Sequence, residues 1–171
     1  MNEFGSPLFI LSKNRLRSNF EEFADAFRRL YPKVSVFYSI KTNALPVVCM
    51  LLHSFGSSAE AVSSYEIYLA RRCGFSGREI LFNGPLKTAD DIKYALEQDV
   101  LAINADSPSE VLEILRLSRR NWHSTRIGVR VDPFPEYNSK LGMDFHTASE
   151  VLQKLRENGV AENTMIQIHL G

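Results

Sequence analysis

The segment Val34-Ser35-Val36-Phe37-Tyr38-Ser39-Ile40-Lys41-Thr42-Asn43 places a lysine at the end of an apolar, β-branched run. β-Branched and aromatic residues favour extended backbone, so we expect a strand over Val34–Ile40. Similar runs follow along the chain, and they predict strands over Ser58–Val62, Glu79–Asn83, Val100–Asn104, Arg126–Val131 and Met165–Leu170. Segments with helical periodicity separate these runs, and this alternation is typical of right-handed βαβ units and a parallel sheet.

The expected helices carry start and stop signals in the sequence. They are predicted to begin near Pro46, Ser64, Thr88, Ser107 and Thr147. Thr88 and Thr147 have the side chains of N-caps, and Gly74 and Gly159 stand where helices should end. Another helix is expected from about Lys13 to Leu30, ahead of the first strand. Its apolar residues recur at spacings of three and four and predict one buried stripe of Leu16, Phe20, Phe23, Phe27 and Leu30.

Polar residues at the ends of the predicted strands separate two possible architectures, an open doubly wound sheet and a (β/α)8 barrel. They are Lys41, Asn83, Asn104, Arg130 and His169. In a barrel the carboxyl ends of the strands converge on one mouth, where catalytic residues collect. A Gly-rich turn, which often follows the first strand of an open sheet, is missing after Ile40. We therefore predict the α/β class, as a partial (β/α)8 TIM-type barrel with about six of the eight βα units.

The length of the chain and one long loop add to this prediction. A closed eight-stranded barrel takes about 250 residues, and the chain has 171. We therefore expect residues 1–171 to be the N-terminal portion of a barrel domain, an incomplete fragment of a longer protein. The segment Asp132–Asp144 is the longest loop between a predicted strand and helix, and its place at the barrel mouth favours a functional role.

Composition excludes several classes of protein. Basic and acidic residues number 20 each, a balance that argues against a nucleic-acid-binding protein. No signal peptide or membrane-spanning segment is evident, so we expect no membrane association. Cys49 and Cys73 lack the spacing of metal ligands, and we predict no metal site. Two free thiols are typical of a reducing compartment, so we expect a cytoplasmic location.

Lys41 is the first candidate for chemistry. A rigid apolar strand would present it into the barrel mouth, where desolvation favours the free amine that imine formation with an aldehyde requires. The alternative from the strand context alone is a lysine that points into solvent.

The segment Tyr38–Asn43 resembles the Tyr-Ala-Val-Lys-Ala-Asn motif of the fold-type III enzymes that use pyridoxal 5′-phosphate (PLP), the ornithine/diaminopimelate decarboxylase family. Other parts of the chain resemble further segments of this family in the same order. They are Pro7–Ile10, Glu60–Ile67, Ile80–Lys87, Ile103–Ser107, Arg130–Pro133, Ser139–Gly142 and Ile168–Gly171. The eight matches cover nearly the whole chain.

The resemblance implies a role for each matching residue. Lys41 would form the internal aldimine with PLP as the catalytic lysine, and His169 would stack its imidazole on the cofactor ring. Glu60 and Glu66 match acidic positions that set the polar network around the lysine. The remaining cofactor-binding assignments are Arg130, Ser63 and Asn83, and the last two have a plain capping role as their alternative.

The function implied is PLP-dependent decarboxylation of a basic or diamino acid, of the diaminopimelate, ornithine or lysine type. The family's C-terminal β-domain and its phosphate-binding Gly-rich loop would lie beyond Gly171, so we expect the fragment alone to be inactive and the full-length protein to be a homodimer. Two alternatives stay open. One is a non-catalytic, regulatory PLP-binding barrel, and the other is an alanine-racemase-type enzyme, against which Ser139–Gly142 and His169–Gly171 count.

Overall fold

A computed structural model describes residues 4–118, 125–134 and 141–169 of the chain. Its strands are β1 (Phe37–Ser39), β2 (Ser58–Ala61), β3 (Ile80–Phe82), β4 (Ala102–Ala105), β5 (Arg126–Val131) and β6 (Thr164–Ile168). Its α-helices are α1 (Lys13–Arg28), α2 (Pro46–Ser54), α3 (Ser64–Arg72), α4 (Ala89–Glu97), α5 (Pro108–Ser118) and α6 (Phe145–Glu157). Short 3₁₀ turns occur at Ile40–Thr42 (η1), Gly77–Glu79 (η2) and Ala161–Asn163 (η4).

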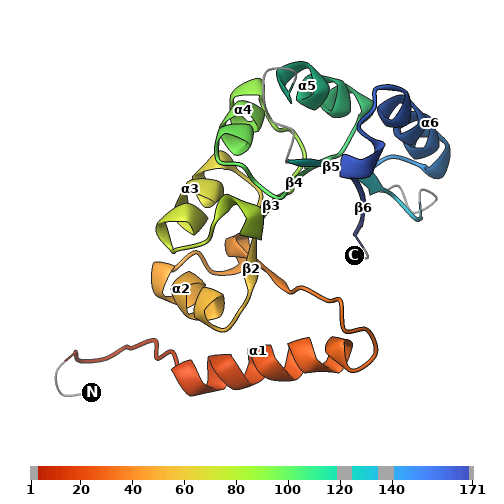
Figure 1. Ribbon diagram of the computed structural model, residues 1–171. Helices are drawn as coiled ribbons and strands as arrows, with labels where there is room; N and C mark the ends of the chain where they lie inside the picture. Colours follow the sequence, from red (N-terminus) through yellow and green to blue (C-terminus); the bar gives the residue numbers. More distant parts are fainter. Residues whose placement is uncertain (1–3, 119–124, 135–140, 170–171) are drawn as a thin grey trace.

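The strands form one parallel sheet in the order β1-β2-β3-β4-β5-β6. A doubly wound sheet reverses its strand order at a switch point, whereas strands of a barrel neighbour one another in chain order. The described sheet has no reversal, and helices α2 to α6 follow its curve as an outer arc (Figure 1). These observations confirm the predicted partial barrel with its six strands.

The hydrophobic core lies between the outer face of the sheet and the helices. Because side chains alternate along a strand, every second residue of the sheet points into this core. On β3, Ile80 and Phe82 are buried, while Leu81 between them lines the opposite face. On β4 and β5, Ile103 and Val129 are fully buried on the helix side. The outer face is therefore apolar, and polar residues of the strands lie on the concave inner face.

Helix boundaries follow the predicted signals, with one correction. The Thr88 hydroxyl accepts a hydrogen bond from Asp91 N, so Thr88 is the N-cap of α4 as expected. Helix α6 begins at Phe145, ahead of the predicted start at Thr147. Its N-cap is Asp144, whose carboxylate accepts from the Thr147 amide at 2.8 Å, so the prediction of Thr147 as the cap is wrong. Asp caps well because its carboxylate also interacts favourably with the helix dipole.

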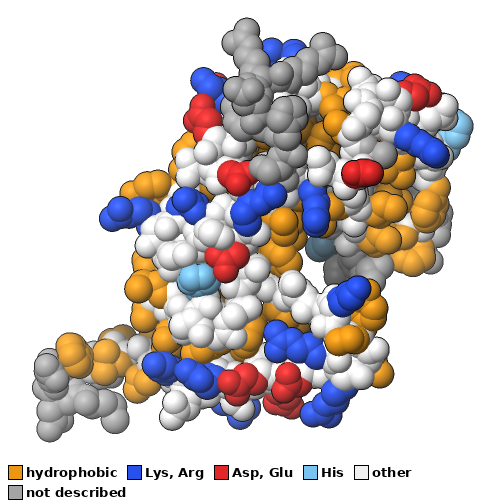
Figure 2. Space-filling view, viewed as in Figure 1, with side chains coloured by type: hydrophobic (Ala, Val, Ile, Leu, Met, Phe, Trp, Pro, Cys, Tyr) orange, Lys and Arg blue, Asp and Glu red, His pale blue; other side chains and the backbone are white. Residues whose placement is uncertain are grey.

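Helix α1 differs from its prediction in the way it packs. Of the predicted stripe, Phe20 is buried, against Val48 and Leu52 of α2. Phe23 and Phe27 are half exposed, and Leu30 is 89% exposed. Helical periodicity identified the apolar face correctly, but no element among the described residues covers most of it. The preceding arm also exposes hydrophobic side chains, Leu8, Phe9, Ile10 and Leu11 (Figure 2).

Candidate active site

The concave face of the sheet carries a cavity of about 660 Å³ that contains most of the predicted site residues. Five of the six, Lys41, Glu60, Asn83, Arg130 and His169, line it, and they come from five different strands or strand ends. The full lining is Phe37, Ser39, Lys41, Thr42, Glu60, Val62, Leu81, Asn83, Gly84, Pro85, Arg130, Leu141, Gln167 and His169. The prediction that strand ends converge on one mouth therefore holds for these residues.

Strand register explains the convergence. Ser39 lies opposite Glu60, and Glu60 lies opposite Leu81, so β1, β2 and β3 present these side chains in one row. On the other side of the cavity, Arg130 of β5 lies opposite Gln167 of β6. Since parallel strands keep their side chains in register, a row of inner residues runs across the sheet.

Lys41 lies in η1, directly after β1, rather than on the strand itself. Two hydrogen bonds hold the following turn: Tyr38 Oη donates to Asn43 O (3.2 Å), and Leu45 N donates to the Asn43 side chain (3.1 Å). The Lys41 side chain is exposed at the cavity, so the desolvation expected from the sequence is not found. Lys41 nevertheless lies in a short turn next to these two hydrogen bonds, and it lines the cavity together with the other polar groups.

Acidic groups lie close to the lysine. Burial raises the pKa of the Glu66 carboxyl above its ordinary value, and the hydrogen bond from Val62 N (2.8 Å) opposes this rise. The negative charge of Glu60 raises the pKa of Glu66 further, and the positive charge of Lys41 lowers it. The charges of Glu60 and Lys41 therefore both act on the Glu66 carboxyl, in opposite directions. Ser63 does not line the cavity, because its hydroxyl caps α3 by accepting from Glu66 N (3.2 Å).

Asn83 belongs to a pair of amides on the inner face. Asn104 Nδ2 donates to Asn83 Oδ1, and Asn104 is 4% exposed. Gly128 faces this pair from β5, where an added Cβ would lie 1.7 Å from Asn104 Oδ1. A side chain at position 128 would therefore displace Asn104. Asn104 was identified from the sequence as a residue at a strand end, whereas the requirement for glycine at position 128 was missed.

Arg130 is held by the carboxylate of Asp106, a residue for which no role was predicted. Its Nη1 donates to Asp106 Oδ1 at 2.8 Å, and both side chains are 11% exposed. The other oxygen of Asp106 accepts from Gly142 N (3.1 Å), so the carboxylate also binds the segment after β5. Gly142 has φ +93° and approaches Arg130 so closely that an added Cβ would lie 3.3 Å from Arg130 Cγ.

A buried ion pair lies beside this group. Lys87 Nζ donates to Glu110 Oε2 at 2.9 Å, with side-chain exposures of 1% and 9%. Burial lowers the pKa of Lys87 below its ordinary value, while the charges of Glu110 and Asp106 counteract this effect. Lys87, Glu110 and Asp106 also border a second hollow next to the cavity, which shares Pro85 and Leu141 with it.

The sequence contained signals for several residues that were missed. Ser39 and Gln167 lie two positions before Lys41 and His169, and the two-residue period of a strand places them on the same face. Lys87 and Asp106 lie within the quoted segments Ile80–Lys87 and Ile103–Ser107. Glu110 follows Ser107 by three residues, a spacing that marks the start of a helix, but this spacing did not indicate its partner Lys87, which is 23 residues away along the chain.

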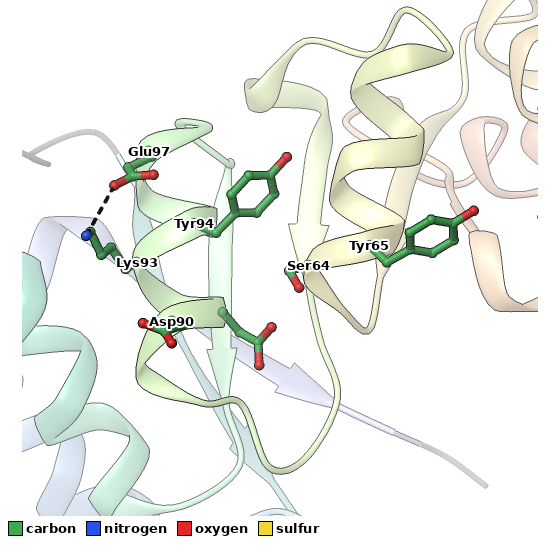
Figure 3. Close-up of a pocket in the computed structure, with 7 residues that line it drawn as sticks. Ser64, Tyr65, Asp90, Lys93, Tyr94 and Glu97 are labelled. Atoms are coloured by element: carbon green, nitrogen blue, oxygen red, sulfur yellow. Dashed lines mark ion pairs between the residues drawn. The ribbon is translucent and has the colours of Figure 1, made fainter.

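Other features lie apart from this cavity. A hollow of about 520 Å³ lies between α3 and α4 on the outer side, with the Lys93–Glu97 ion pair (3.9 Å) on its wall (Figure 3). Among the described residues, no three His, Cys, Asp or Glu side chains are grouped to hold a metal ion. No helix in the described ranges has the length and hydropathy needed to cross a membrane. Ser139, Lys140, Leu170 and Gly171 of the quoted motifs lie outside the described residues.

Comparisons with known proteins agree with the fold. A curated diaminopimelate decarboxylase from Methanothermobacter thermautotrophicus is 33% identical over 99% of this chain and 41% of its own length. A lysine/ornithine decarboxylase from Selenomonas ruminantium is 26% identical over 91% of this chain and 39% of its own. The crystal structure of the diaminopimelate decarboxylase from M. jannaschii in complex with L-lysine has a TM-score of 0.86 at 26% identity, over 99% of this chain and 43% of that one.

The chain spans about two fifths of the length of the curated relatives it matches. The family described as the pyridoxal-dependent decarboxylases, pyridoxal binding domain, matches residues 15–171. The match confirms the resemblance seen in the motifs and the pyridoxal cofactor that it implied. From its sequence and its fold alike, this chain belongs to the pyridoxal-binding domain family of the pyridoxal-dependent decarboxylases.

Proposed function

We propose that this chain provides the PLP-anchoring part of an enzyme that decarboxylates a basic or diamino acid, with Lys41 as the residue that bonds to the cofactor's aldehyde. The observation that carries the proposal is the meeting of Lys41, Arg130 and His169 in one cavity on the concave face of the sheet. An amine, a guanidinium and an imidazole there match the needs of an aldehyde, an anionic group and a flat aromatic ring.

The composition of the cavity fits PLP. Its volume of about 660 Å³ lies within the range of small-molecule sites. Ser39 lines the cavity, and its hydroxyl is buried without a hydrogen-bond partner among the described residues. Gly84, with φ +93°, brings the backbone close to Val62, where an added Cβ would lie 3.1 Å from the Val62 carbonyl oxygen. A buried unpaired hydroxyl and a close backbone approach are features of a site shaped for a ligand.

Each residue has a role in this proposal. Lys41 Nζ is the nucleophile toward the aldehyde, and its exposure at the cavity leaves it accessible. Glu60 lines the same cavity as Lys41, and we assign it the role of accepting a proton from the lysine's ammonium group. His169 would hold the cofactor ring through its flat imidazole, and Arg130 would orient anionic groups of the cofactor or substrate. When bound, pyridoxal phosphate supplies an electron sink for the charge left on the α-carbon as the carboxylate leaves.

Asn83 contributes through its amide, which lines the cavity beside Gly84. Ser63 is the weakest of the proposed cofactor contacts, since its hydroxyl already caps α3. We therefore assign Ser63 a supporting role in placing Glu66, whose amide it caps.

The substrate class rests on the relatives, whose names specify diaminopimelate and lysine or ornithine. These share an α-amino acid with a second amine, and a basic or diamino acid is the class that we propose. We further propose that residues 1–171 form the N-terminal portion of a barrel domain in a homodimeric, cytoplasmic protein. The relatives' greater length supports the N-terminal portion, and the free thiols of Cys49 and Cys73 support the cytoplasmic location.

The experiment is to mix the chain with PLP, reduce with NaBH₄ and map the pyridoxyl group by peptide mass spectrometry. We expect modification at Lys41, and none there in Lys41→Ala. Lys33, Lys93 and Lys154 are exposed internal controls for nonspecific reaction. Modification spread evenly over the exposed lysines would contradict the assignment of Lys41.

A second arm uses a chain extended to the length of the relatives and measures CO₂ release from diaminopimelate, lysine and ornithine. A specific adduct without CO₂ release would favour a non-catalytic PLP-binding protein.

A further inference from the structure

Lys87 is a buried lysine that does not line the cavity. Its side chain is 1% exposed, and its Nζ donates to Glu110 Oε2 (2.9 Å) and to Gly84 O (2.5 Å). The ammonium also lies 5.6 Å from the centre of the Phe82 ring. A buried charge is costly unless it is paired and hydrogen-bonded, and Lys87 meets both conditions.

Glu110 connects two loops at the mouth of the sheet. One oxygen accepts from Lys87 N (3.0 Å), and the other accepts from Asp106 N (2.8 Å) as well as from Lys87 Nζ. The loop after β3 is thereby joined to the loop after β4. Glu110 lies in the first turn of α5, where a carboxylate interacts favourably with the helix dipole.

Asp106 extends this connection to the cavity. Its backbone amide is held by Glu110, and its carboxylate binds Arg130 and Gly142 N. An unbroken series of polar contacts therefore runs from Lys87 through Glu110 and Asp106 to Arg130, which lines the cavity. The four side chains carry two positive and two negative charges, so the series is neutral as a whole.

The loop that Lys87 ends has a strained backbone. Leu86 has φ +60°, which is uncommon for a residue with a Cβ, and Gly84 has φ +93°. Gly84 and Pro85 line the cavity, while Lys87 binds back to the carbonyl of Gly84. Strained conformations persist where surrounding contacts determine them, and they concentrate at functional sites. Here the contact from Lys87 to Gly84 O fixes the turn.

The buried ion pair of Lys87 and Glu110 is not explained by its contribution to stability alone. Well-packed apolar residues often replace a buried ion pair without loss of stability, because desolvation offsets most of the Coulomb attraction. A directional pair, by contrast, fixes the relative position of the groups it joins.

We propose that Lys87 is a positioning residue that, through Glu110 and Asp106, holds Arg130 and the Gly84–Pro85 segment in place around the Lys41 cavity. This inference rests on the proposed function, which assigns PLP to that cavity. Lys87 itself does not line the cavity, so it acts through these neighbours.

Two variants test the proposal. Lys87→Met removes the ammonium and preserves most of the side-chain volume. Lys87→Met combined with Glu110→Gln removes both charges, so no unpaired carboxylate is left buried, and the single side-chain oxygen of Gln can accept from one of the two backbone amides that Glu110 binds. The matched control is Lys93→Met with Glu97→Gln, which removes an exposed pair on the outer face of α4 (Figure 3).

The first measurement needs no cofactor. Amide hydrogen exchange of Asp106 and Gly142 reports whether Asp106 is held, since their N–H groups bond to Glu110 and Asp106. In both Lys87 variants we expect these amides to exchange at least about fivefold faster. The reason is that Glu110 no longer accepts the charge-assisted hydrogen bond from the Lys87 ammonium. Buried amides of β4 should keep their rates, which shows that the fold is retained. Unchanged exchange at Asp106 and Gly142 would overturn the proposal.

The second measurement uses PLP. We expect the dissociation constant for PLP to rise about tenfold or more in the Lys87 variants. Loss of the residues that orient metal ligands in metalloproteins weakens metal binding by a similar factor. The pH at which the absorbance of the bound cofactor changes should also shift, because Arg130 no longer holds its place. The Lys93/Glu97 control should leave both values unchanged. A folded double variant with unaltered PLP affinity and pH profile would refute positioning by Lys87. Failure of the unmodified chain to bind PLP would instead refute the proposed function, and the exchange measurement would still decide the role of Lys87.

Discussion

The two faces of the sheet are formed by the same strands, and neighbouring residues along a strand lie on opposite faces. On β3, Phe82 points to the helices and is 1% exposed, whereas Asn83 just after it lines the cavity. On β5, Val129 is buried in the core and Arg130 faces the cavity. The outer face is apolar and covered by helices, while the inner face holds charges, amides and an unpaired hydroxyl. The hydrophobic core and the candidate site therefore use alternate residues along the strands.

The largest effect expected from this comparison is the loss of Phe82. Phe82→Ala removes a buried ring from the core between the sheet and the helices. We expect the free energy of unfolding to fall by about 3–5 kcal/mol, from lost transfer energy and the cavity left behind. Urea unfolding followed by circular dichroism measures it. A loss below about 1 kcal/mol would mean that the outer face does not provide the main core.

Gly128→Ala is expected to have the next largest effect, this time from the inner face. An added Cβ would lie 1.7 Å from Asn104 Oδ1, so Asn104 has to move. We expect a loss of about 1–3 kcal/mol in unfolding free energy, the usual cost of overpacking.

A second substitution isolates the cause. In Gly128→Ala with Asn104→Ala the clashing amide is gone, and we expect most of the loss to be recovered. Such non-additivity is typical of residues in direct contact. Simple addition of the two single effects would show that the cost arises in the backbone of β5 rather than at Asn104.

Asn83→Ala provides the counterpart to Phe82→Ala one residue away. Asn83 is half-buried and accepts one hydrogen bond through its side chain, from Asn104. We expect a loss of about 1–2 kcal/mol in unfolding free energy, because the buried amide of Asn104 is left without its acceptor. PLP affinity should decrease as well, and fluorescence titration measures it. If Asn83→Ala destabilised the chain as much as Phe82→Ala, the division of roles between the two faces would be wrong.

Residue patterns in the sequence predicted much of this architecture. Alternating apolar runs identified all six strands, and β5 was predicted with its observed bounds, because a strand covered by helices needs β-branched residues on that side. Lys41, Arg130 and His169 were found because polar residues at strand ends of a barrel meet at one mouth. The packing of α1 was mispredicted, because periodicity shows that a face is apolar but not which element covers it.

The contacts that hold the site were less accessible to sequence reasoning. The pair of Lys87 and Glu110 joins residues 23 positions apart, and the pair of Asp106 and Arg130 joins residues 24 apart. Each residue by itself is a charged side chain in a loop or the first turn of a helix, which is usually exposed. Only the sheet register brings the loops together, so the partners become visible once neighbouring strands are known.

The smallest expected effect concerns the outer helical layer and its dependence on pH. The hydrogen bond from Thr147 N to Asp144 holds the pKa of this carboxyl below its ordinary value, as the bond from Ser76 N does for Glu79. A carboxyl whose pKa is lower in the folded state stabilises the fold above its unfolded pKa, near 4 for both residue types. That stabilisation is lost as the pH falls through the folded value of the pKa.

We therefore expect urea midpoints to decrease between about pH 5 and pH 3. The variant Asp144→Asn retains a capping side chain but does not ionise, so we expect it to show a smaller decrease. If the variant and the unmodified chain showed the same decrease between these pH values, the Asp144 cap would not contribute to acid sensitivity. The inner-face variant Asn83→Ala is the matched comparison, since it leaves both capping carboxylates intact and should show the full decrease.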